Sequence, residues 1–356
     1  MSRFWTIFIR SLLWLGLAGG LVSCRRADTA TALPTPVVMA VKPTAASPTP
    51  VPTTAPLSGA WVVVQPDSTP ADAQAWAAET RAWAEDAGLR WVTVPDLDAA
   101  AAQMPVTALV ALPPTPWADA QGWAVAHPEA RVLAWVLEAG AIPDPAGLPP
   151  NLTLMVREPL TWEQRFFLAG YTTALAAPHW RAGLLYTSPP GYAALTLAGD
   201  FNRGATYWCG PCVPAHPPML SYPFAVEVPP GVEDAASWQE AARNLLAQAP
   251  MEAVYVRGPV PDPALDVFRQ RNVRILWDGS PNPKADVSVY FDPWAPLDAD
   301  WAAAWLQGEG ESVMYARWRL DSADPAVFSP GRARQVERMV ALLRAGRVSP
   351  ESLLEP

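Results

Sequence analysis

Short apolar runs alternate with helix-like segments from Trp61 almost to the end of the chain, and this alternation limits the available folds more than any other feature. Residues 61–64 read as a buried strand, and residues 71–87 as a helix with Trp76 and Trp83 on one face, ended by Gly88. Further strands are expected at residues 89–94, 106–112, 132–137, 152–156, 182–186, 224–228, 253–256, 273–277, 287–290 and 313–318. Further helices are expected at residues 117–126, 162–177, 192–207, 235–249, 263–271, 301–306 and 332–343.

Strands that alternate with helices of this length form parallel sheets covered on both faces. The expected strands are too many for one open sheet, so we predict an α/β fold of two doubly wound parallel-sheet lobes. Lobe 1 is expected at residues 58–178 and lobe 2 at residues 179–272. Residues 273–356 are expected to return to lobe 1 as crossing segments and to end in a closing helix, with hinges near Pro178 and Val273.

The N-terminus is typical of an export signal. Arg3 and Arg10 flank a short apolar stretch at residues 11–22, which is too short for a spanning helix. Residues 21–24, Leu-Val-Ser-Cys, resemble the lipobox of bacterial lipoproteins, which implies a signal peptide at residues 1–23 and lipidation of Cys24. An ordinary secretion signal and an uncleaved anchor remain as alternatives.

Residues 24–57 are rich in proline, threonine and alanine and have no hydrophobic periodicity. A proline-rich spacer of this length reaches up to about 100 Å. We therefore expect an extracytoplasmic protein, lipid-anchored to the membrane of a bacterium. The net charge is −9 for the full chain and about −11 once the two arginines of the signal leave, which disfavours nucleic acid and anionic lipid as partners.

Several short segments resemble one family of substrate-binding lipoproteins. Residues 163–171, Glu-Gln-Arg-Phe-Phe-Leu-Ala-Gly-Tyr, are similar to a helix of the form Glu-Gln-x-x-Phe-Leu-x-Gly-x in the basic membrane protein family. The strand at 181–186, the Phe-x-x-Gly of 201–205 and the strand at 274–278 follow in that family's order. Its closing helices are matched by the segments 302–308 and 331–349.

This resemblance implies a type 1 periplasmic-binding-protein fold and a component of an ABC importer, with a permease as partner and a nucleoside-like ligand. Asp278 matches the aspartate with which the family accepts hydrogen bonds from ligand hydroxyls. Two family features are absent. A proline-rich segment at residues 257–263 replaces a glycine-rich loop, and no lysine lies at residues 291–292.

The segment Trp208-Cys209-Gly210-Pro211-Cys212 matches the active site of thioredoxin-like oxidoreductases. That chemistry needs a cysteine at the N-terminus of a helix, where the helix dipole favours the thiolate. Here the motif follows a predicted helix and precedes prolines. We predict a structural disulfide between Cys209 and Cys212, with redox activity or metal binding as the alternatives.

Residues for other chemistry are scarce. His127, His179 and His216 all lie beside prolines, in expected loops, and no spacing among them indicates a metal pair or a general base. No glycine-rich phosphate loop and no nucleophile elbow is found. We therefore expect no enzyme, no catalytic residue, no metal and no cofactor.

Ligands of such folds bind beyond the carboxyl ends of the strands, in two-lobed forms between the lobes. Loops expected at those ends include residues 65–68, 113–115 and Glu138. The predicted ligand-binding residues are Asp67, Ser68, Tyr186, Ser188, Arg257, Trp277 and Asp278. This set suits a small polar ligand with hydroxyl groups, and Tyr186 or Trp277 is expected to stack on a flat ring.

Three functions follow from these patterns. The first is a monomeric solute-binding lipoprotein that delivers a small molecule to an ABC permease. The second is a surface lipoprotein without a transport role, which uses the same fold to contact a protein or an envelope polymer. The third is a thiol oxidoreductase, which would reduce insulin and lose that activity on Cys209→Ser.

Overall fold

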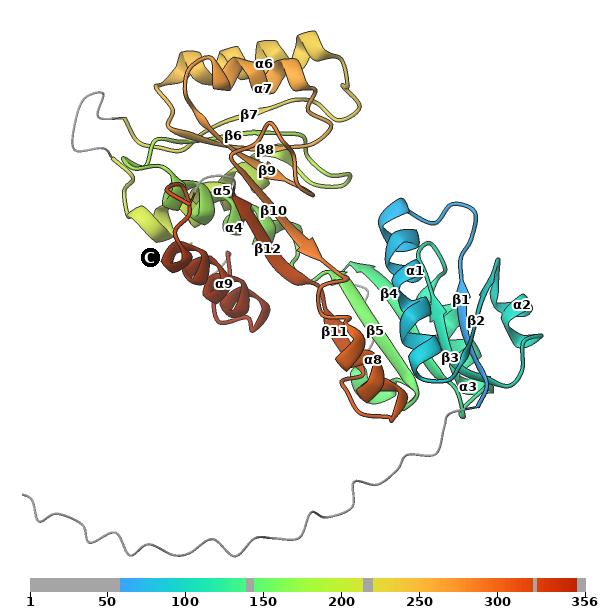
Figure 1. Ribbon diagram of the computed structural model, residues 1–356. Coiled ribbons are helices and arrows are strands. Elements are labelled where there is room, and N and C mark those ends of the chain that lie inside the picture. The colour runs from blue at the N-terminus through green and yellow to red at the C-terminus, as the bar shows by residue number, and fades with distance from the viewer. Residues whose placement is uncertain (1–57, 139–143, 214–219, 323–324, 351–356) are drawn as a thin grey trace, which may run out of the picture. The chain divides into compact units, whose positions relative to one another are not determined.

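The computed structural model describes residues 58–138, 144–213, 220–322 and 325–350. The predicted signal peptide, lipobox and spacer lie outside these residues, as does His216. Two six-stranded sheets form the described part of the chain (Figure 1), which confirms the predicted α/β class with two parallel-dominated sheets. We call each sheet with its covering helices a lobe.

The first lobe contains a fully parallel sheet with strand order β11-β5-β4-β3-β1-β2. Its strands are β1 (Ala60–Val64), β2 (Arg90–Val94), β3 (Val106–Ala111), β4 (Arg131–Glu138), β5 (Leu152–Glu158) and β11 (Val313–Tyr315). Its helices are α1 (Ala71–Asp86), α2 (Leu97–Ala101), α3 (Trp117–Ala126) and α8 (Ala299–Leu306), with a 3-10 turn η2 (Pro145–Gly147). Along β1, Trp61 and Val63 pack towards α1 and α8, and Val62 and Val64 pack towards α2 and α3.

The second lobe has strand order β12-β10-β9-β8-β6-β7, and β12 is its one antiparallel strand. Its strands are β6 (Ala182–Tyr186), β7 (Phe224–Glu227), β8 (Ala253–Arg257), β9 (Arg274–Asp278), β10 (Val287–Asp292) and β12 (Arg317–Ser322). Helices α4 (Trp162–Ala176), α5 (Ala194–Cys209) and α9 (Pro330–Arg344) cover one face, and α6 (Ala235–Gln248) and α7 (Asp262–Arg269) the other.

The chain passes three times between the two sheets: from β5 to α4, from β10 to α8, and from β11 to β12. The packing therefore differs from the predicted boundaries 58–178 and 179–272. Every residue from Phe166 to Ala176 in α4 is buried within the second lobe, and β9, β10, β12 and α9 also belong to it. The expected hinges near Pro178 and Val273 are wrong, because neither residue lies on a connection between the sheets.

One predicted strand is in fact two. Residues 313–318 read as a single apolar run, but the chain leaves the first sheet at Tyr315 and enters the second at Arg317. The backbone N–H of Ala316, between the two strands, donates to the carbonyl of Val156. Hydrophobicity cannot reveal this break, because both strands have buried residues. Helix α2 and the turn η2 were not expected, since such short elements carry too little periodicity.

Two glycines allow α4 and α5 to pack closely. A Cβ atom at Gly170 would overlap the carbonyl oxygen of Phe201, and one at Gly204 would overlap the carbonyl oxygen of Phe167. Both obstacles are backbone atoms that cannot rotate away, so only hydrogen fits at these positions. The helix pair therefore depends on the Gly of each of the two segments that resemble the lipoprotein family.

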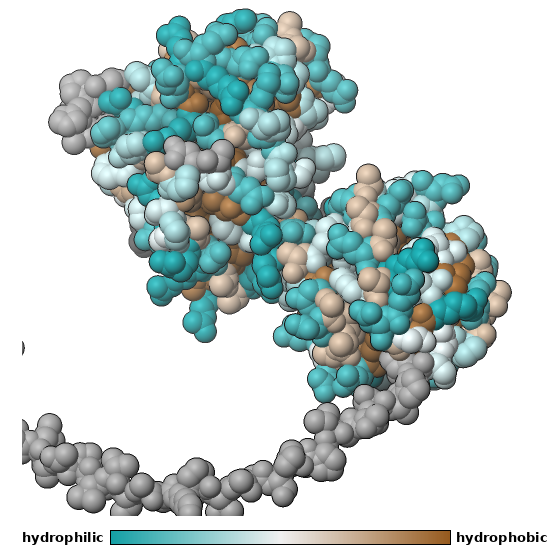
Figure 2. Space-filling view, in the orientation of Figure 1, coloured by the Kyte–Doolittle hydropathy of each residue, from teal (hydrophilic) through white to brown (hydrophobic). Residues whose placement is uncertain are grey.

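The described residues hold their own hydrophobic cores. Each lobe has one apolar cluster on each face of its sheet, and the members of all four clusters lie between Ala60 and Val348. Hydrophilic residues cover most of the surface seen in Figure 2. A fragment of residues 58–356 therefore contains everything that the cores require. Among the described residues, the structure contains no helix with the length and apolar character needed to span a membrane.

Candidate functional site

Two arginines share one buried carboxylate in the second lobe. Arg257 forms a salt bridge with Oδ2 of Asp278, and Nη2 of Arg165 lies 3.2 Å from Oδ1 of the same residue. The Asp278 side chain is only 6% exposed, and Arg165 also pairs with Glu158 at the end of β5. Charges removed from water to this degree persist only when they are paired, so these four residues form one unit.

Local structure explains why these side chains meet. Arg257 is the last residue of β8 and Asp278 the last of β9, and the carboxyl ends of these parallel neighbours lie at the same edge of the sheet. Arg165 is in the first turn of α4, which begins with a capping box between Thr161 and Gln164. The cap fixes the start of the helix and thereby the direction of Arg165.

An indole ring completes the cluster. The guanidinium carbons of Arg257 and Arg165 lie 4.1 Å and 4.5 Å from the centre of the Trp162 ring. Cation–π contacts of this kind stabilise partly desolvated guanidinium groups. Burial, followed by repulsion from Arg165, lowers the pKa of Arg257 to about 10, so this side chain is still charged at neutral pH.

The arrangement can recognise neighbouring hydroxyl groups. A guanidinium presents several N–H donors in one plane, and a carboxylate presents two oxygen acceptors. Together, an arginine and an aspartate can each form two hydrogen bonds to the two hydroxyl groups of a diol. Trp162 lies against both guanidinium groups and is itself partly exposed. The cluster leaves little free volume, since a void of about 10 Å³ beside Arg165, Tyr255, Asp278 and Phe291 has room for no more than one water molecule.

The structure brings two of the predicted ligand residues together, Arg257 and Asp278. It gives Tyr186 and Ser188 buried positions. The Tyr186 hydroxyl donates to the carbonyl of Ala194 at 2.8 Å, its ring packs on Phe166, and burial raises its pKa to about 12. Tyr186 therefore belongs to the core and has no ring face free for a ligand.

The other predicted ligand residues lie elsewhere. Asp67 and Ser68 form an exposed turn after β1 in the first lobe. Trp277 is adjacent to Asp278 in β9, so it points to the opposite face, where it packs against the core beneath α6 and α7. Glu138 ends β4 in register with Glu158. Among the described side chains, those of Asp67, Ser68 and Trp277 contribute no contact to the Arg165–Asp278–Arg257 cluster.

Sequence reasoning missed Trp162, Arg165 and Glu158. Arg165 stands at a variable position of the helix segment that resembles the lipoprotein family, so the resemblance gave it no role. A signal was nevertheless present: Arg165 directly precedes the stretch Phe166–Ala176, which contains no charged residue and is buried throughout. Such a residue has to find a partner, and the strands that end nearby supply it.

A hollow of about 500 Å³ lies at the carboxyl ends of β1, β2 and β3 in the first lobe. The predicted loops contribute Pro66, Pro114 and Thr115 to its lining, and the aspartates at positions 96, 98 and 119 line it too. Asp96 is also the N-cap of α2, where its side chain accepts from Ala99. This hollow is acidic, whereas the Arg–Asp cluster carries both signs of charge.

The cysteines of the Cys-x-x-Cys motif are bonded to each other, as predicted. Cys209 is the last residue of α5, and Cys212 follows it, buried, in a left-handed conformation. The C-terminus of a helix carries partial negative charge, which disfavours a thiolate. This position therefore argues for a structural disulfide and against an oxidoreductase site.

Similarity to one solved structure supports the fold, and two weaker similarities accompany it. A solved ABC transporter solute-binding protein from Conexibacter woesei is 15% identical, has a TM-score of 0.52 and matches 82% of this chain and 98% of its own. A transcriptional activator of the comK gene from Bacillus halodurans (TM-score 0.46, 13% identity) matches 82% of this chain and 100% of its own. A carbohydrate-transporter solute-binding protein from Agrobacterium radiobacter, in complex with D-arabinose (0.41, 13%), matches 80% and 100%.

Neither a known protein family nor a curated protein matches the sequence. The similarity to the Conexibacter protein, together with the strand orders and the three connections, defines the architecture as a two-lobed fold of the periplasmic-binding-protein type. At such low identity the likeness concerns architecture alone.

Proposed function

We propose that this protein is the extracytoplasmic solute-binding component of an ABC importer and holds a small polar ligand at the Arg165–Asp278–Arg257 cluster. The observation that carries the proposal is this cluster, with Trp162 against it, at the carboxyl edge of β8 and β9. In open α/β sheets, that edge is where ligands bind. A monomer that delivers its ligand to a membrane permease fits this role.

The donors and acceptors of the cluster favour a ligand with adjacent hydroxyl groups on a ring. Nucleosides and sugars both carry such a group. The resemblance of residues 163–171 and of Asp278 to the basic membrane protein family favours a nucleoside. The segment 257–263, rich in proline, lacks the backbone donors of that family's glycine-rich loop, so we expect the ribose-like diol to provide most of the contacts.

We expect a matching ligand to raise the melting temperature of residues 58–356. Since the ligand binds only the folded protein, a concentration one hundred times its dissociation constant adds about 2.7 kcal/mol of stability, or about 5 °C. A thermal-shift panel of nucleosides, sugars and amino acids measures this effect. A shift with nucleosides alone supports the family's ligand, and a shift with sugars alone corrects the ligand class. No shift across the panel contradicts the solute-binding proposal.

We also propose that Cys24 carries the lipid that anchors the protein. The lipobox-like segment 21–24 and the proline-rich spacer behind it support this anchor. Wild-type protein is expected to enter the detergent phase when membranes are partitioned, and Cys24→Ser to remain in the aqueous phase. Cys209→Ser is the matched control and should partition like the wild type. Equal partitioning of Cys24→Ser and wild type would rule out the lipid.

One observation favours a second function, that of a surface lipoprotein without a transport role. Both arginines of the cluster already contact Trp162 and share Asp278, and the adjoining void is small. A protein that kept the fold but lost its solute would show such an internally satisfied site. This second function predicts that residues 58–356 are well folded and that no compound of the panel changes their melting temperature.

A further inference from the structure

Three helix segments of the second lobe meet at the end opposite the candidate site. Trp162, at the start of α4, packs against Tyr192 just before α5, and Tyr171 packs against Trp208 near the end of α5. Helices α4 and α5 therefore run in the same direction, away from the edge where β8 and β9 end. Their carboxyl ends lie where the parallel strands begin.

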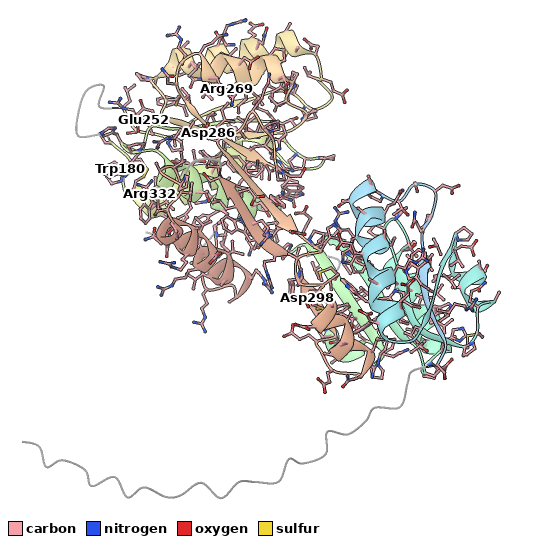
Figure 3. All side chains as sticks on the ribbon, in the orientation of Figure 1. Trp180, Glu252, Arg269, Asp286, Asp298 and Arg332 are labelled. Carbon is pink, nitrogen blue, oxygen red and sulfur yellow. A yellow bond between two sulfur atoms is a disulfide. The ribbon has the colours of Figure 1, made fainter. Side chains whose placement is uncertain are left out.

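Helix α9 runs the other way. The Gln164 side chain, near the start of α4, donates to the carbonyl of Leu343 near the end of α9, at 3.1 Å. The first half of α9 therefore lies beside the carboxyl end of α4. In the view of Figure 3, Trp180, which follows α4, and Arg332, which lies in the first turn of α9, are both labelled toward this end of the lobe.

Large aromatic side chains are exposed at this end. Tyr207 is 46% exposed, Trp208 38% and Trp180 37%, although rings of this size are usually well buried. Tyr207 and Trp208 end α5, where the disulfide of Cys209 holds the following turn. Tryptophan and tyrosine are the residues that favour the boundary between water and lipid, because their rings are apolar and their N–H and O–H groups are polar.

Arginines are concentrated in the same place. The first half of α9 carries three arginines, at positions 332, 334 and 338, and a single acid, Glu337, in a chain whose net charge is −9. Arg334 and Arg338 are exposed, and neither forms a salt bridge within the described part of the chain. Positive side chains in the first turns of a helix oppose its dipole, so helix stability does not account for them.

The carboxyl ends of α4 and α5 and the first half of α9 bring some of these aromatic and basic side chains together. The buried ring of Tyr171 lies 5.6 Å from that of Trp208 and 6.3 Å from that of Tyr207, measured between centroids. Burial, and then Tyr207, raise the pKa of the Tyr171 hydroxyl. The positive charge of Arg338, on α9, acts on the same hydroxyl and lowers its pKa by a smaller amount. We name Trp180, Tyr207, Trp208, Arg334 and Arg338 the aromatic–basic face.

We propose that the aromatic–basic face docks on the surface of an anionic phospholipid bilayer. Arginines attract anionic headgroups, and the exposed rings insert at the level of those headgroups. The overall charge of −9 does not prevent this, because charges further than about 8–10 Å from the membrane are screened at physiological salt. The expectation that acidic composition excludes anionic lipid therefore does not apply to this face.

Binding of residues 58–356 to vesicles tests the proposal, because this fragment lacks Cys24 and any lipid attached to it. We expect sedimentation with vesicles of phosphatidylcholine containing about 30% phosphatidylglycerol, weakening as salt rises, and much less with phosphatidylcholine alone. Each arginine raises the affinity about fivefold, so Arg334→Gln with Arg338→Gln should lower it about 30-fold.

A matched control uses the same change of charge elsewhere in the lobe. Arg243→Gln with Arg271→Gln alters the groove between α6 and α7 and should leave vesicle binding unchanged. Equal losses in the two double variants would overturn the proposal, since charge alone would then explain them. A fragment that binds neither type of vesicle would also overturn it and would point to an acidic protein as the partner of this face. Neither result bears on ligand binding, which the thermal-shift panel measures separately.

Discussion

Gly204→Ala is expected to lower the free energy of unfolding of residues 58–356 by about 3 kcal/mol. The new methyl group would overlap the carbonyl oxygen of Phe167, so α4 and α5 would have to move apart. That separation would disturb the closely packed pair of α4 and α5 and the buried Phe201. Urea unfolding followed by circular dichroism measures the loss.

Gly199→Ala is the matched control in the same helix. Its Cβ atom would meet nothing closer than a side-chain nitrogen of Arg203 at 3.6 Å, which is an ordinary contact. Replacing a helical glycine without a clash should raise the stability by up to about 1 kcal/mol. If Gly204→Ala and Gly199→Ala unfold at the same urea concentration, the close approach of α4 and α5 is not as described.

Asp278→Asn is the second substitution with a large expected effect. It removes the negative charge between Arg165 and Arg257, whose side chains are only 15% and 17% exposed. Glu158 still pairs with Arg165, but Arg257 is left as a nearly buried, unpaired cation. Breaking a buried pair in this way costs about 3–5 kcal/mol. Urea unfolding at neutral pH should show this loss.

Two further variants identify the cause of that loss. Asp262→Asn breaks an ion pair between Asp262, whose side chain is 65% exposed, and Lys284. Because this pair is exposed, its loss should lower the free energy of unfolding by less than about 1 kcal/mol. Asp278→Asn combined with Arg257→Met removes both charges and should recover part of the stability. A double variant less stable than Asp278→Asn by the full effect of Arg257→Met would mean that the two charges do not interact.

Periodicity was sufficient to predict most of the fold. Buried strands such as β1 and β6 and the amphipathic α6 were expected close to their observed ends, because each has a clear period and a clear terminating residue. The assignment of elements to lobes was less accurate. Helix α4 packs against the second sheet because its apolar surface fits segments that are distant in the sequence. No local pattern in residues 162–176 indicates which of the two sheets this is.

The candidate site was predicted in part. Arg257 and Asp278 were expected because each directly follows a predicted parallel strand, and the carboxyl ends of such strands share one edge. Tyr186 also ends a strand, and the same rule wrongly predicted that its ring is free to contact a ligand. The rule locates the end of a strand but does not state on which face of the strand a side chain lies. Arg165 and Trp162 come from a helix, and only the packing of that helix against β8 and β9 brings them to the carboxylate.

Isothermal titration calorimetry on residues 58–356, with the compounds that raise the melting temperature, measures whether the Arg165–Asp278–Arg257 cluster holds a ligand. We expect saturable binding of one ligand per chain, at least about tenfold weaker in Trp162→Leu, because stacking and the guanidinium positions both depend on that ring. Trp180→Leu, an exposed tryptophan of the same lobe, should bind like the wild type. Absence of heat with every compound, or equal affinity in Trp162→Leu and the wild type, would contradict a ligand site at the Arg165–Asp278–Arg257 cluster.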